Sequence, residues 1–94
     1  MKYKNDFGFL DEADIKLVIN DTNQEPVWTG IGNELPPGEL LADAKAVLLV
    51  IPEESTVDNL NLILKDILSK IPEDTFFLYT SADKKRMEIY VNKN

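Results

Sequence analysis

Four residues near the start of the chain, Asp11-Glu12-Ala13-Asp14, have the letters of a motif that binds magnesium in nucleotide-hydrolysing helicases. In those enzymes the carboxylates work together with a phosphate loop of the form G-x-x-x-x-G-K-[ST], whose lysine and hydroxyl hold phosphate and metal. The chain contains no such loop. We therefore interpret the tetrapeptide as a solvated turn or helix end, not as a nucleotide site.

A second motif that could bind phosphate lies further along the chain. The stretch Gly30-Ile31-Gly32-Asn33-Glu34-Leu35 begins like a G-x-G-x-x-G fingerprint but has a leucine where the third glycine belongs. A bound phosphate would also meet the carboxylates of Glu34 and Glu39, which would repel it. This stretch is interpreted as a loop.

Carboxylates also gather at Glu53, Glu54 and Asp58, directly after an apolar segment and at the expected start of a helix. Ligands of α/β proteins often bind at such a place. A metal site would need further oxygen ligands, for which Asp43 or Asp83 are candidates, but the spacing matches no EF-hand or other defined pattern. Helix capping and the helix dipole account for the same three residues. No metal and no cofactor is predicted.

Two residue types that carry much of enzyme chemistry are missing. The chain has no cysteine and no histidine, which removes disulfides, thiolate nucleophiles, His-based zinc sites and the usual Ser-His-Asp triad. Carboxylate, lysine or tyrosine catalysis remains chemically open. The prediction is a protein that is not an enzyme.

The negative charge is concentrated in the first part of the chain. The formal net charge is −7, and residues 5–58 hold twelve acidic residues against two lysines, a local charge of −10. A surface of this kind repels nucleic-acid backbones and attracts basic proteins. The basic run Lys84-Lys85-Arg86 is too small to reverse this effect. Simple solubility explains the acidity equally well.

Hydrophobic patterning predicts the elements of the second half. Residues 46–51 are almost entirely apolar, as in a central strand covered on both faces. An amphipathic helix is expected at about 55–71, with Ser55 and Asp58 forming a capping box. Residues 75–80 and 86–91 read as strands joined by a hairpin loop, and the strand-helix-strand order predicts a parallel crossover.

The first half is patterned more weakly. Alternation of Ile15, Leu17 and Ile19 favours a strand, residues 27–29 could form the returning strand, and residues 6–13 a short helix. The central strand needs a cover on each face, yet only one strong helix is present. The second cover must come from the N-terminal segment, a twin subunit or a partner.

Taken together, these patterns predict an α+β fold of one small globular domain, 1–94. Its sheet is mixed and four- to five-stranded, with one main amphipathic helix and a C-terminal β-hairpin. No apolar run approaches the length of a membrane span and no secretory signal is evident, so a cytoplasmic location is expected.

The hydrophobic order of residues 9–19, 47–51 and 60–71 is similar to that of small non-catalytic α/β subunits, such as the psi subunit of the bacterial clamp loader. The C-terminal strands depart from that pattern. The resemblance implies a non-catalytic binding role and assigns no residues.

The functional hypothesis is a non-catalytic, acidic protein-protein interaction domain: an adaptor, inhibitor or immunity-like protein that occupies a partner with a basic surface. Phe77, Tyr79 and Tyr90 are expected on the less protected face of the sheet, because tyrosine favours interface cores. With Glu53, Glu54 and Asp58 they form the predicted partner-binding set. An acidic DNA mimic that inhibits a nucleic-acid-binding protein is one alternative, and a carboxylate-based metal-binding domain or small enzyme is another. A homodimer is also compatible with the sequence, whereas direct nucleic-acid or membrane binding is not expected.

Overall fold

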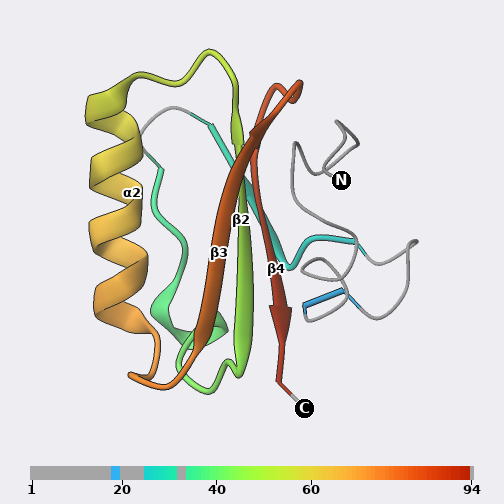
Figure 1. Cartoon of the computed structure of the whole chain (residues 1–94), viewed down its shortest axis with the longest axis vertical. Coiled ribbons are helices and arrows are strands. Elements are labelled where there is room, and N and C mark those ends of the chain that lie inside the picture. The colour runs from blue at the N-terminus through green and yellow to red at the C-terminus, as the bar shows by residue number, and fades with distance from the viewer. Residues whose placement is uncertain (1–17, 20–24, 32–33, 94) are drawn as a thin grey trace, which may run out of the picture.

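The computed structural model describes residues 18–19, 25–31 and 34–93, which form one mixed sheet and one main helix (Figure 1). The elements are β1 (Trp28–Gly30), the 3-10 helix η1 (Gly38–Leu40), β2 (Ala46–Pro52), α2 (Val57–Lys70), β3 (Phe76–Ala82) and β4 (Met87–Asn92). The predicted α+β class, with a four-stranded mixed sheet and one main helix, is confirmed.

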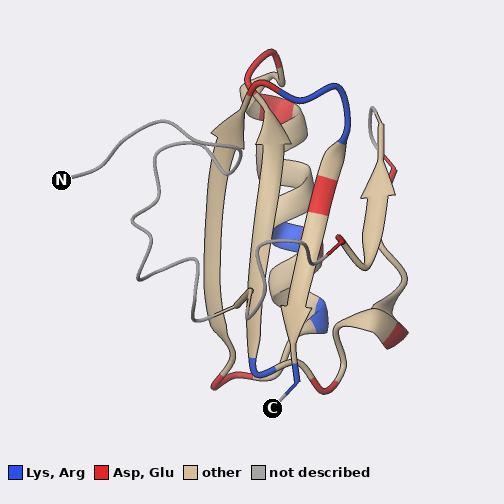
Figure 2. Cartoon of the chain, turned by 90° about the vertical axis from the view of Figure 1, so that its right-hand side faces the viewer, with Lys and Arg blue, Asp and Glu red and all other residues tan. Residues whose placement is uncertain are grey.

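The strands lie in the order β1-β4-β2-β3, side by side in Figure 2. β2 and β3 are parallel along their whole length, from Ala46 opposite Phe76 to Pro52 opposite Ala82. β4 is antiparallel to both β2 and β1. The parallel crossover through α2 is therefore confirmed. β1 nearly coincides with the strand predicted at 27–29, but within the described residues it pairs with β4 and not with residues 18–19.

The last two strands follow one another in the chain and run in opposite directions, as expected, but they are not hydrogen-bonded to each other. β2 lies between them and pairs with both. The connection must cross two strand spacings, about 10 Å, which residues 83–86 can span. β2 is apolar on both faces, so a central place with two neighbours buries more of it than an edge would.

β2 contributes to a separate apolar cluster on each face of the sheet. On the α2 side, Val47, Leu49 and Ile51 pack with residues such as Ile63 and Ile67 of α2 and Ile89 of β4. On the other side, Ala46, Leu48 and Val50 pack with Val18, Ile19, Ala82 and Tyr90. Full burial of one such aliphatic side chain contributes about 1.5–3 kcal/mol.

Two residues of the N-terminal segment help to cover the face of the sheet opposite α2. Val18 and Ile19 are both buried on the face opposite α2. A strand with Ile15, Leu17 and Ile19 facing the core would turn Val18 outward. Because Val18 and Ile19 are both buried, the predicted alternation is wrong at these two residues. Neither described residue belongs to a strand. The remaining residues of that predicted strand and the short helix at 6–13 lie outside the described residues.

α2 begins one residue later than the capping box predicted. Thr56 is the N-cap, and its hydroxyl accepts a hydrogen bond from the backbone N–H of Asn59 (3.1 Å). Asp58 lies in the first turn, where a carboxylate complements the helix dipole. Ser55 is therefore not the cap, because the extended backbone at Thr56 directs that hydroxyl towards the free N–H groups. No helix among the described residues is long and apolar enough to cross a membrane.

Candidate interaction surface

One flank of α2 leaves apolar side chains exposed. Ile63 and Ile67 face the sheet and are buried. Four apolar residues spaced three or four apart lie on one flank of this buried line: Val57, Leu60, Leu64 and Leu68. Leu60 and Leu64 pack partly against the core, whereas the side chains of Val57 and Leu68 are 70% and 56% exposed. The helix thus presents more apolar surface than its own sheet covers.

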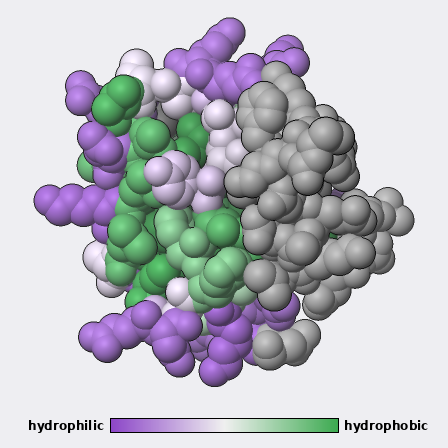
Figure 3. Space-filling model, in the orientation of Figure 1, coloured by the Kyte–Doolittle hydropathy of each residue, from purple (hydrophilic) through white to green (hydrophobic). Residues whose placement is uncertain are grey.

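Aromatic residues of β3 continue this surface. Phe77 and Tyr79 lie on the α2 face of the strand, with ring centroids 6.2 Å apart and ring planes 29° apart. The Tyr79 side chain is 50% exposed. We call the group Val57, Leu60, Leu64, Leu68, Phe77 and Tyr79 the α2–β3 surface. Figure 3 shows apolar atoms gathered over α2 and β3, with hydrophilic groups around them.

A pocket of about 230 Å³ lies at one end of this surface, between the N-terminal end of α2 and the carboxyl ends of β2 and β3. It is lined by residues that include Glu53, Ser55, Leu60, Tyr79 and Ser81. Its position is one where ligands of α/β proteins often bind. Sites for small molecules usually measure about 300–1,000 Å³, so this pocket is smaller than most of them.

Tyr90 does not belong to this surface. It lies on the opposite face of the sheet with Leu48 and Val50, is 5% exposed, and donates a hydrogen bond from its hydroxyl to Glu88 (3.2 Å). Phe77 and Tyr79 lie on the α2 side, so the expectation that all three aromatic residues share the less protected face is wrong. The physical reason is the strand order, because β3 and β4 flank β2 and their registers turn these residues to different faces.

The predicted carboxylates Glu53, Glu54 and Asp58 are brought to the same end of the molecule as the pocket, and all three are exposed. The backbone N–H of Glu53 donates to the carbonyl of Ala82 (3.0 Å), which holds this turn against the end of β3. Within the described ranges, no group of three Asp, Glu, His or Cys side chains has an arrangement that could hold a metal ion. Glu53, Glu54 and Asp58 therefore form an acidic border at one end of the α2–β3 surface.

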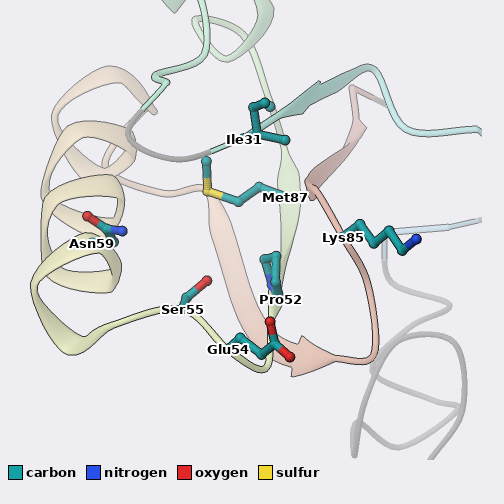
Figure 4. Close-up of a pocket in the computed structure, with 8 residues that line it drawn as sticks. Ile31, Pro52, Glu54, Ser55, Asn59, Lys85 and Met87 are labelled. Carbon is teal, nitrogen blue, oxygen red and sulfur yellow. The ribbon is translucent and has the colours of Figure 1, made fainter.

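A second pocket, of about 180 Å³, lies on the other side of α2 (Figure 4). It includes Ile31, Glu54, Ser55, Asn59 and Met87. Lys85 also lines it, but its amino group points away from the cavity in Figure 4.

The glycine motif has a packing explanation. A Cβ atom at Gly30 would overlap the indole ring of Trp28, which packs against the α2-side core. Gly30 is therefore required by the close approach of the Trp28 side chain, which covers part of the core. Gly32, like the tetrapeptide at Asp11, lies outside the described residues.

No model of a known protein family matches the chain, and no curated protein matches it in sequence.

The helical spacing alone predicts core positions for Leu64 and Leu68, on the same stripe as Ile67 and Ile71, and does not reveal the exposed apolar flank of α2. The usable signal was the width of that stripe, because Val57, Leu60, Ile63, Leu64, Ile67, Leu68 and Ile71 cover more of the helix than one small sheet can bury.

Proposed function

We propose that this chain is a non-catalytic protein-interaction domain, acting in the cytoplasm as an adaptor, inhibitor or immunity-like protein, that binds its partner through the α2–β3 surface. The observation that carries the proposal is the exposure of Tyr79 and Leu68 beside the half-buried Phe77, Leu60 and Leu64. Contiguous exposed apolar surface with a polar border is typical of interaction sites, and tyrosine is enriched among their energetically dominant residues.

The acidic border defines the kind of partner. Glu53, Glu54 and Asp58 lie at one end of the surface, and the whole chain carries a net charge of −7. Like charge would slow the approach of an acidic protein, whereas a basic protein would be attracted. The partner is therefore expected to present an apolar patch next to lysine or arginine residues.

Binding variants test the proposal directly. Native partners would be captured from a lysate of the source cell with the tagged wild-type chain and with a Leu68→Ser, Tyr79→Ser double variant, followed by mass spectrometry. The matched control is Leu62→Ser, which alters an exposed leucine (45%) on the other flank of the same helix. A protein that the wild type and the control capture, and the double variant does not, supports the proposal. Equal capture by all three contradicts it.

The acidic DNA-mimic alternative predicts a different dependence on salt. A mimic binds through many exposed carboxylates, so its affinity falls steeply between about 50 and 200 mM salt. An apolar surface such as that of Leu68 and Tyr79 is affected much less. Measuring the affinity for the captured partner over this range separates the two mechanisms, and a steep loss would favour the mimic.

A further inference from the structure

The outer edge of β3 is open within the described part of the chain. β3 pairs with β2 on one side, and no other described strand pairs with it. The strand has seven residues, Phe76–Ala82, and contains neither a charged residue nor a proline. Edge strands usually carry such residues to prevent pairing with another chain. β3 therefore keeps its capacity to accept a further strand.

The hydrogen-bond pattern shows which backbone groups point outward. The N–H of Phe76 donates to Lys45 (2.9 Å), and the carbonyl of Ala82 accepts from Glu53 (3.0 Å), so both residues face β2. Alternate residues of a parallel strand face the same neighbour. The N–H and C=O groups of the intervening residues, Phe77, Tyr79 and Ser81, are therefore directed to the open edge.

The α2–β3 surface lies beside this edge. A segment that paired with Phe77, Tyr79 and Ser81 would point every second side chain towards the α2 side of the sheet. There it would meet Tyr79 and the exposed flank of α2 around Leu68. One bound segment can thus use the backbone edge and the apolar surface at the same time.

Carboxylates lie at both ends of the strand. The exposed Glu73 and Asp74 immediately precede β3, and the turn with Glu53 and Glu54 is bonded to its last residue (Figure 2). Lys84 and Lys85 also lie near the carboxyl end, in the loop with Asp83. Lys84 is paired with Glu88 of β4, on the far side of β2 (3.7 Å), which leaves Lys85 against three carboxylates, Glu53, Glu54 and Asp83. An incoming segment would therefore gain most from positive charge at both of its ends.

The net charge disfavours a second copy of the chain as the occupant. Antiparallel pairing of two β3 strands centred on Tyr79 would bring Glu73 and Asp74 of one copy towards Lys84 and Lys85 of the other, as well as towards Glu53 and Glu54, so the local charges largely offset each other. Each copy nevertheless carries −7 overall, and two such copies repel each other.

We infer that the partner supplies an extended segment that adds as a strand to the outer edge of β3, uncharged and alternately apolar in the middle, with lysine or arginine at both ends. This inference rests on the proposed function, because the segment uses the α2–β3 surface. The backbone hydrogen bonds provide affinity, and the alternating side chains provide specificity.

Selection from a phage-displayed library of random peptides of about nine residues tests the inference. Enriched peptides should have apolar residues at alternate positions and basic residues at both ends. They should bind the Ser81→Ala variant as well as the wild type. They should bind the Ser81→Pro variant roughly tenfold more weakly or worse, because proline removes one outward N–H.

Amide hydrogen exchange of the wild-type chain provides a second readout that needs no variant. Bound peptide should slow the exchange of the Phe77, Tyr79 and Ser81 amides by roughly tenfold or more. Failure to enrich any peptide, or enrichment of peptides with acidic ends, would overturn the inference. If peptides bind but leave these amides unprotected, strand addition is wrong while the proposed function stands. Protected amides without peptide, in a particle of twice the mass, would identify a second copy as the occupant instead.

Discussion

The two edge strands of the sheet, β1 and β3, differ in length and in what lies beside them. At the β1 edge the strand has only three residues, Trp28 covers the core, and the following loop is tied to α2 by a hydrogen bond from Lys70 to the carbonyl of Pro36 (2.8 Å). At the β3 edge the strand has seven uncharged residues and no described strand beyond it. Both are edge strands, but the β1 edge is short and its following loop is attached to α2, whereas the β3 edge is longer and carries exposed apolar groups.

The largest expected effect on stability comes from proline substitutions in β3, where one side of the strand pairs with β2 and the other is the sheet edge. Thr80→Pro removes an N–H that faces β2 and should destabilise the fold by about 3 kcal/mol or more. Ser81→Pro removes an N–H that faces outward and should cost about 1 kcal/mol or less. Urea denaturation of both variants measures the difference. Equal losses would show that the outer edge is already paired.

At the β1 edge, Gly30→Ala should destabilise the protein by about 1–3 kcal/mol, because the added methyl group overlaps the Trp28 ring. Gly38→Ala is the matched control. A Cβ at that position would lie 3.8 Å from carbons of Lys70, an ordinary contact, so its stability should change little. Thermal or urea unfolding checks both, and equal effects would contradict the packing account of Gly30.

The hydrogen bond between Lys70 of α2 and the loop at Pro36 should contribute less to stability. Lys70→Met removes the hydrogen bond to Pro36 and the ion pair with Asp66 (2.8 Å), and should cost about 1 kcal/mol because the side chain is partly exposed. Lys65→Met removes the same charge from an exposed position on the same helix and should change stability by about 0.5 kcal/mol or less. If the two variants unfold alike in urea, the loop is not held by Lys70.

The smallest effect concerns Asp43, in the turn before β2, which pairs with Lys93 just after β4. A hydrogen bond from Lys93 (3.0 Å) is the main cause that lowers the pKa of Asp43 below its ordinary value of 3.8, with a weaker contribution from Lys45. Lys93→Ala should therefore raise this pKa more than Lys45→Ala, as measured by NMR titration of the carboxyl carbon. A lowered pKa stabilises the fold above pH 3.8, and this contribution is lost as the pH falls through the lowered value. A larger effect of Lys45→Ala would reverse the assignment.

Local pattern predicted most of the fold in the second half of the chain. The apolar run at Ala46 specified β2, and the helical spacing from Val57 to Ile71 specified α2, because burial on two faces and on one stripe leave different periodicities. The candidate surface was only partly predictable. Tyr79 is expected in the partner-binding set from its residue type, whereas helical periodicity predicts a core position for Leu68, because periodicity does not show how wide a cover the sheet provides.

Composition and contacts between near neighbours specify the class of fold, the main helix and the acidic, cysteine-free and histidine-free chemistry of this protein. Tertiary structure alone decided that β2 separates β3 from β4, that Tyr79 and Tyr90 face opposite sides, and that β3 is an edge. Strand alternation specifies which residues share a face but not which strands become neighbours. That choice depends on how the whole chain buries β2 on both faces, and it leaves the edge of β3 available for a partner.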